Sequence, residues 1–178
     1  SGIMSEPLFL PFKGDVRSLA VADFNEDGLN DIALSVQREI SGIMMWESRP
    51  GRKWEKAVEP TNFGSYEGVA AGDINGDGHV DLAAANASSD SEGGIRVWLG
   101  DGTGNWSSET GPVATGVYMD VVIADFNEDG LLDLAGSGWG TYGAVRIWLG
   151  NGRGGWSARP EIGKGSFYKL SVVDINGD

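Results

Sequence analysis

The chain has 178 residues, 40% of them hydrophobic, so it can form a substantial core and is not disordered throughout. Its formal net charge of −13 argues against partners that are nucleic acids or anionic membranes, because like charges repel. The absence of cysteine excludes disulfides, thiol catalysis and cysteine-ligated zinc. No apolar run is long enough to cross a bilayer, so no membrane insertion is expected.

A nine-residue motif recurs along the chain at intervals of about 50 residues. It reads D-x-N-x-D-G-x-x-D, with complete copies beginning at Asp23, Asp73 and Asp125 and the start of a fourth at Asp174. Self-similarity at such a period is typical of repeat architectures. The predicted units are an initial segment at 1–14, repeats at 15–64, 65–116 and 117–165, and a partial repeat at 166–178.

Each repeat is predicted to contain four short strands, most clearly in the second copy. Residues 69–71 run into the motif and residues 80–85 leave it, both rich in small apolar side chains. Residues 94–99 form a third apolar run, and a glycine-rich turn at 100–105 leads to a fourth run that begins at Trp106. Because the chain shows no helical periodicity, it is predicted to be all-β. Four-stranded units at this period indicate the blades of a β-propeller.

Six of the seven tryptophans keep the step of the repeat. One follows each motif, and a second comes eight residues later, giving Trp46 and Trp54, Trp98 and Trp106, and Trp148 and Trp156. Recurrence in every repeat favours packing roles over separate binding functions. Trp139 stands outside this pattern.

The motif has the composition of a site for a hard cation. Oxygen-bearing side chains stand at positions 1, 3, 5 and 9, glycine at position 6 permits a sharp turn, and position 7 offers a backbone carbonyl. The helix–loop–helix calcium motif ends instead with Glu at position 12, where this chain has Leu34, Ala84 and Gly136, so Asp at position 9 is expected to close the loop. An acidic turn without metal is the alternative, since Asp, Asn and Gly all favour turns.

Three Ca²⁺ ions are expected, one in each complete loop, where they stabilise the fold and perform no chemistry. The predicted ligands are Asp23, Asn25, Asp27, Leu29 and Asp31; Asp73, Asn75, Asp77, His79 and Asp81; Asp125, Asn127, Asp129, Leu131 and Asp133; and, in the partial copy, Asp174, Asn176 and Asp178. Metal catalysis also needs an open coordination position beside a base. The single histidine, His79, stands at a backbone-ligand position, so the chain is not expected to be an enzyme.

Aromatic residues near the joints between repeats are the candidates for ligand binding. Tyr66 and Tyr118 each stand seven residues before a motif, where they either pack between blades or stack on sugar rings. The segments 86–93 and 137–143 differ most between copies, and variable polar loops on a rigid scaffold often carry recognition. Further candidate ligand residues in them are Trp139, Tyr142, Asp90 and Glu92.

The motif, followed by I-x-[VI]-W-L-G-x-G-x-G-x-W, resembles the FG-GAP/VCBS repeat, a family that includes the integrin α-subunit propeller, certain fungal lectins and many secreted microbial proteins. The first copy departs from it at residues 46–54, where the glycine-rich turn is replaced. The resemblance implies a propeller, usually of seven blades, with calcium between the first two strands of a blade and ligand surfaces on the opposite face. Residues 8–13 read as an outer strand of a preceding blade.

About three blades are predicted here, whereas a closed propeller needs at least four. We therefore expect the chain to be part of a larger propeller or to self-associate to complete a ring. Three hypotheses for function stand: a calcium-stabilised module for adhesion or protein binding, a lectin-like carbohydrate-binding propeller, and the non-catalytic propeller of a polysaccharide-acting enzyme. Because such loops fill at millimolar calcium, an extracellular or cell-surface location is expected, with a protein or glycan as the partner.

Overall fold

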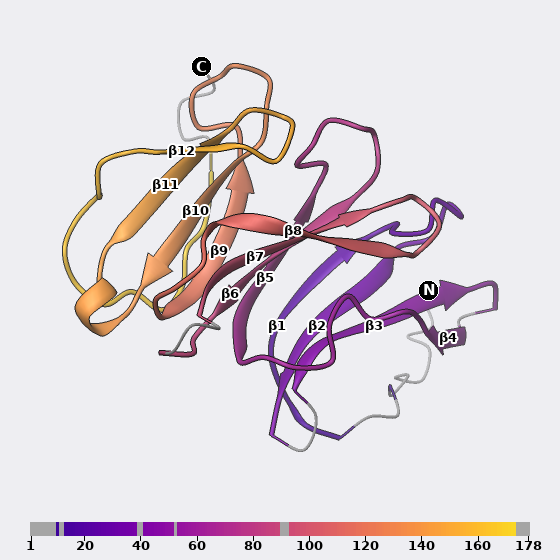
Figure 1. Cartoon of the computed structure of the whole chain (residues 1–178). Coiled ribbons are helices and arrows are strands. Elements are labelled where there is room, and N and C mark those ends of the chain that lie inside the picture. The colour runs from indigo at the N-terminus through magenta and orange to yellow at the C-terminus, as the bar shows by residue number, and fades with distance from the viewer. Residues whose placement is uncertain (1–9, 11–12, 39–40, 52, 90–92, 174–178) are drawn as a thin grey trace, which may run out of the picture.

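The computed structural model describes residues 10, 13–38, 41–51, 53–89 and 93–173. Within these residues, twelve strands form three antiparallel sheets of four strands each (Figure 1). Sheet 1 contains β1 (Asp15–Ala22), β2 (Asp31–Gln37), β3 (Gly42–Arg49) and β4 (Lys53–Lys56). Sheet 2 contains β5 (Tyr66–Gly72), β6 (Asp81–Asn86), β7 (Gly94–Gly100) and β8 (Trp106–Val113). Sheet 3 contains β9 (Tyr118–Ala124), β10 (Asp133–Gly138), β11 (Val145–Gly150) and β12 (Trp156–Ala158).

Each sheet is a meander in which neighbouring strands are consecutive in the chain. The register is the same in the three sheets: the residue before each acidic motif pairs with the ninth residue of the motif, as Ala22 with Asp31, Gly72 with Asp81 and Ala124 with Asp133. In all three sheets, the pairing between the first and second strands also shifts register near the start of the first strand. The repeated motif is therefore the hairpin between the first two strands of each sheet.

The sheets pack face to face in chain order, with the first strands β1, β5 and β9 neighbouring one another and the fourth strands further apart (Figure 1). Between sheets 1 and 2, Ile43 and Met45 contact the layer that contains Leu82 and Trp98. An equivalent core between sheets 2 and 3 contains Ile95 and Leu134, with other residues. Because sheet 2 is covered on both faces, every residue of β6 is buried, which accounts for the apolar run at residues 82–85 inside it.

The prediction of all-β repeats with four strands each is confirmed. The first tryptophan of each repeat is buried and the second is half-buried, as the packing interpretation expects. Closure of a ring and the number of blades stay predictions. No helix among the described residues is long and apolar enough to cross a membrane.

Two details were not foreseen in the sequence, and one expected strand falls mostly outside the described residues. The β3–β4 hairpin forms without a glycine-rich turn, because Pro50 and Gly51 (φ 82°) reverse the chain before Lys53 pairs with Arg49. A short 3₁₀ helix, η1 (Gly140–Tyr142), follows β10. The strand expected at 8–13 lies mostly outside the described residues, and Leu10 packs on the outer face of sheet 1 without belonging to a strand.

Candidate metal loops and ligand surfaces

The three acidic loops, at residues 23–31, 73–81 and 125–133, fold with the same internal hydrogen bonds. In the second loop, the Asp77 N–H donates to Asp73 Oδ1 at 3.1 Å and to Asn75 Oδ1 at 2.9 Å. The N–H of Gly78 donates to Asp73 Oδ2 at 2.9 Å, and that of His79 donates to Asp77 Oδ1 at 2.9 Å. All four bonds recur at the equivalent atoms of the first and third loops. The side chains at positions 1 and 3 thus converge on the amide of position 5.

Left-handed backbone at two positions gives these loops their shape. Position 6 is glycine in every copy, with φ between 84° and 93°, so a side chain there would be strained. Position 4 is also left-handed, and it is Glu26 (φ 56°) in the first loop and Glu128 (φ 60°) in the third. Non-glycine residues adopt this conformation at an energetic cost. The same strained turn is therefore kept in loops whose position-4 residues differ.

The ninth residue of each motif has a role that the motif alone did not predict. Asp81 is fully buried at the start of β6, where its Oδ2 accepts the N–H of Ile74 at 2.8 Å and its Oδ1 accepts that of Gly100 at 3.0 Å. Asp31 and Asp133 are equally buried and bind the equivalent amides. Each carboxylate thus joins its acidic loop to the end of the third strand of the same sheet.

Burial changes the acidity of two of these carboxyl groups. Desolvation raises the pKa of Asp81 to about 6, and it raises that of Asp31 above its usual value. Hydrogen bonds from backbone N–H groups oppose the shift in both cases. The ninth-position carboxylates are therefore held in an environment that offers backbone donors but little water.

The donor chemistry of the loops fits a hard cation. Each loop presents carboxylates at positions 1 and 5, an amide oxygen at position 3 and a carbonyl at position 7, which are the ligand types of Ca²⁺. Within the described part of the chain, no three Asp, Glu, His or Cys side chains are arranged closely enough to hold a metal. The reason is local: position 3 is an amide, and the carboxylate of position 9 faces backbone amides. The fourth set, Asp174, Asn176 and Asp178, lies outside the described residues.

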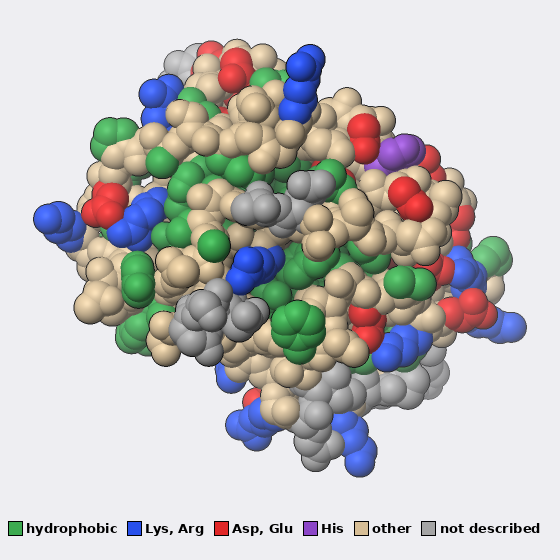
Figure 2. All heavy atoms as spheres, viewed as in Figure 1, with side chains coloured by type: hydrophobic (Ala, Val, Ile, Leu, Met, Phe, Trp, Pro, Cys, Tyr) green, Lys and Arg blue, Asp and Glu red, His purple; other side chains and the backbone are tan. Residues whose placement is uncertain are grey.

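The acidic loops of neighbouring sheets meet along one edge of the molecule. The turn between β7 and β8 lies against the first loop, so a Cβ atom on Gly102 would be 2.5 Å from His79 Nδ1 and 2.7 Å from Glu26 Oε1. Those two side chains pair with each other at 2.5 Å between His79 Nδ1 and Glu26 Oε1, and this bond raises the pKa of His79. The turn between β11 and β12 lies against the second loop in the same way, because Gly152 is close to the Asn75 carbonyl. In Figure 2 the histidine lies among acidic side chains at the rim.

A family model for the FG-GAP-like repeat matches residues 23–84 and 73–136, and the two matches together span more than half of the chain. The chain belongs to the FG-GAP-like repeat family. Comparison with curated proteins gave no match. In this chain each FG-GAP-like match begins at the first aspartate of an acidic loop and continues into the second strand of the following sheet.

The same geometry in two FG-GAP-like repeats places Tyr66 and Tyr118 in the core and not on a ligand surface. They are 3% and 1% exposed, and their rings contact those of Trp98 and Trp148 in the same sheet. Neither ring offers an open face for a sugar. Of the two roles that the sequence left open for these tyrosines, the structure supports packing.

Trp139 and Tyr142 lie at the edge of sheet 3 opposite its acidic loop, in and beside η1. Trp139 is half-buried, and its ring contacts that of Tyr168 at 4.5 Å between centroids. Tyr142 and Tyr168 are exposed, at 37% and 59%. The Gly140 N–H donates to Ser166 Oγ, which joins η1 to the segment that carries Tyr168. The predicted polar partners Asp90 and Glu92 lie outside the described residues.

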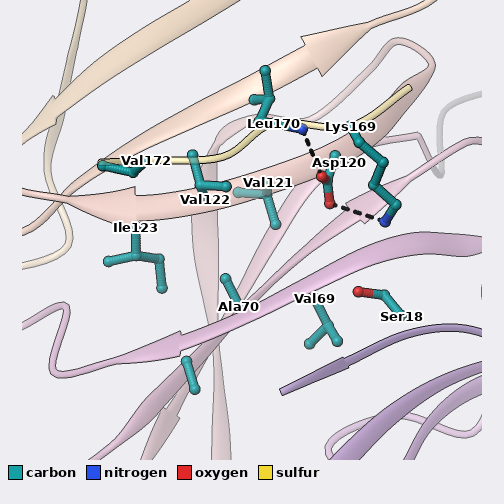
Figure 3. Close-up of a pocket in the computed structure, with 11 residues that line it drawn as sticks. Ser18, Val69, Ala70, Asp120, Val121, Val122, Ile123, Lys169, Leu170 and Val172 are labelled. Carbon is teal, nitrogen blue, oxygen red and sulfur yellow. Dashed lines mark hydrogen bonds and ion pairs between the residues drawn. The ribbon is translucent and has the colours of Figure 1, made fainter. Parts of the chain in front are cut away.

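A groove of about 410 Å³ runs along the first strands of the FG-GAP-like repeats, with apolar walls from β5, β9 and residues 170–172. Its buried ionisable group is Asp120, which accepts the Leu170 N–H at 2.9 Å and pairs with Lys169 Nζ at 3.4 Å (Figure 3). Gly68 makes room for it, since a Cβ atom there would be 2.4 Å from Asp120 Oδ1. Sequence reasoning missed Asp120 because it occurs once and has no counterpart in the other repeats.

Proposed function

We propose that this chain is a calcium-stabilised β-propeller module that binds an extracellular protein or glycan and is not itself an enzyme. The observation that carries the proposal is the identical hydrogen-bond pattern of the three acidic loops, which orients the same hard oxygen donors at the same edge of each sheet. One loop of this kind is compatible with an ordinary acidic turn. Three copies with the same strained backbone favour a shared ligand.

The residues that would hold Ca²⁺ are those at positions 1, 3, 5 and 7 of each loop. When bound, the cation offsets the repulsion between clustered carboxylates. A ligand that binds only the folded chain stabilises it in proportion to the logarithm of the ligand concentration. Since calcium is millimolar outside cells, a secreted or cell-surface location suits weakly binding loops of this kind.

A propeller arrangement agrees with the packing of the sheets. The three sheets present their first strands toward a common groove, as blades do around a propeller axis. Leu19 and Val21 of β1 remain 58% and 53% exposed. We propose that a further blade, from a longer chain or from a second copy, covers this surface and continues the ring.

The exposed aromatic surface at η1 favours a glycan as the second candidate partner. Tyr142, Tyr168 and the half-buried Trp139 offer ring surface at the edge opposite the acidic loops. An aromatic face covers the apolar side of a sugar ring, while nearby polar groups bind its hydroxyls. Ser166, on the segment that carries Tyr168, is one such polar group.

The test of the metal role is thermal unfolding with calcium and with EGTA. We expect millimolar Ca²⁺ to raise the melting temperature, and the triple variant that carries Asn in place of Asp27, Asp77 and Asp129 to lose most of that rise. Mg²⁺ at the same concentration controls for ionic strength. Equal melting temperatures in calcium and EGTA would contradict the proposal.

The test of the ligand surface is a glycan array probed with the wild-type chain and with Trp139→Ala. Lys164→Ala serves as a control, because Lys164 is exposed on the segment after β12 that carries Tyr168. Glycan binding that Trp139→Ala abolishes and Lys164→Ala keeps would support the lectin-like role. Binding that survives Trp139→Ala would place the recognition surface elsewhere.

A further inference from the structure

The first acidic loop has a different neighbour from the other two where the third strand of the sheet ends. The β7–β8 turn begins with Asp101 and the β11–β12 turn begins with Asn151, whereas sheet 1 has Arg49 at the equivalent position. Asp101 and Asn151 each accept backbone N–H groups from their own turn. Arg49 is all donor and cannot do so, and its side chain is directed to other partners.

The guanidinium of Arg49 binds three carboxylates, one of which belongs to the acidic loop. Its Nη1 lies 3.2 Å from Asp27 Oδ2, its Nε donates to Glu55 Oε2 at 3.0 Å, and its Nη2 pairs with Glu47. About one third of the Arg49 side chain is exposed, as is that of Asp27. The hydrogen bond to Glu55 and the charge of Glu47 raise the pKa of Arg49, so it remains cationic.

The equivalent carboxylates of the other loops accept side-chain hydrogen bonds from neutral amides. Asp77 Oδ2 accepts from Asn75 Nδ2 at 2.8 Å, and Asp129 Oδ2 accepts from Asn127 Nδ2 at 2.9 Å. An amide is uncharged and carries an acceptor oxygen beside its N–H donors, so it is compatible with a bound cation. A guanidinium has no acceptor atom, so it must leave before a cation takes its place.

We infer that Arg49 makes the first acidic loop a weaker calcium site than the second and third, because its guanidinium competes with Ca²⁺ for Asp27. This inference rests on the proposed calcium function. The guanidinium lies 3.2 Å from Asp27 Oδ2, so a cation can take that oxygen only by displacing the guanidinium. The second and third loops therefore fill at lower calcium concentrations than the first.

The test is a calcium titration followed by the amide signals of Gly28, Gly78 and Gly130 in ¹H–¹⁵N correlation spectra. Each of these N–H groups donates to the first aspartate of its own loop, so each reports one site. In the wild-type chain, the midpoint of the Gly28 signal is expected at about tenfold higher Ca²⁺ concentration than the midpoints of Gly78 and Gly130. The reason is that the partly exposed guanidinium of Arg49 competes with Ca²⁺ for Asp27.

The variant Arg49→Asn, which introduces the residue of the third sheet, is expected to bring the Gly28 midpoint to those of Gly78 and Gly130. Arg17→Gln is the control, because it removes the same charge from β1, where Arg17 pairs with Glu67 and Gln37 away from the loops. It should leave the order of the midpoints unchanged.

Two outcomes would overturn the inference alone: equal midpoints for the three glycines in the wild-type chain, or a Gly28 midpoint that Arg49→Asn does not change. The first needs no variant and so does not depend on how Arg49→Asn folds. If Gly78 and Gly130 also fail to respond to calcium, the proposed function itself is overturned together with the inference.

Discussion

Replacing Asp81 by asparagine separates the structural role of this carboxylate from any role in cation binding. Both of its oxygens accept backbone N–H groups, from Ile74 at 2.8 Å and from Gly100 at 3.0 Å. Asparagine has one acceptor oxygen, so its NH₂ group would face one of these two donors. One buried N–H would then lose its partner while the shape of the side chain hardly changes.

The expected loss of unfolding free energy follows from this one unpaired N–H group. A buried donor without a partner costs about 1–3 kcal/mol. Part of this cost is offset, because the variant no longer buries the carboxylate whose pKa burial raises to about 6. We expect a net loss of about 2 kcal/mol. In a chain of this length that lowers the melting temperature by about 4–8 °C.

The assay is thermal unfolding followed by circular dichroism in EGTA, where no calcium contributes to stability. Asp77→Asn is the matched control, because its side chain lies on the exposed part of the same loop. In EGTA, Asp81→Asn should unfold at the lower temperature while Asp77→Asn stays near wild type. If the melting temperature of Asp81→Asn in EGTA lies within about 1 °C of the wild-type value, the reasoning from backbone hydrogen bonds is refuted.

Three further substitutions test the packing. Gly68→Ala should destabilise the fold by about 1–3 kcal/mol in urea unfolding, because its Cβ would lie 2.7 Å from the Cα of Asp120; an unchanged midpoint would contradict this. Leu82→Ala should cost about 2–5 kcal/mol, since this side chain is fully buried between sheets 1 and 2, and a loss below about 1 kcal/mol would show that the cavity collapses. Asp101→Asn should keep the melting temperature, as Asn151 makes the equivalent bonds, whereas Asp101→Ala should lower it; equal melting temperatures would show that the turn does not need this side chain.

The elements that sequence reasoning predicted well are those that recur. The acidic motif marks the hairpin between the first two strands of every sheet, and the tryptophans at 46, 98 and 148 are buried in every sheet. Recurrence helps because a residue needed for packing must appear in each repeat, while a residue needed once need not.

The features that could not be predicted from the sequence depend on burial or involve a residue that occurs in one repeat only. Asp81 has the chemistry of a cation ligand and also that of an acceptor for buried amides, and the motif is the same in both cases. Its position directly before an apolar strand was the available signal for the second role. Tyr66 was ambiguous for the same reason, since an aromatic residue at a joint suits packing and sugar binding alike. Asp120 and Arg49 each occur in one repeat, so no periodicity pointed to them.

The contacts of the β7–β8 and β11–β12 turns with the preceding acidic loops make the array behave as a row of nearest neighbours. In such a row, the stability of one unit depends on its own contacts and on the two interfaces beside it. Sheet 2 has both interfaces within this chain, through the cores around Trp98 and Leu134, whereas sheets 1 and 3 share one each. Opening is therefore expected to begin in the outer sheets and to reach β6 last.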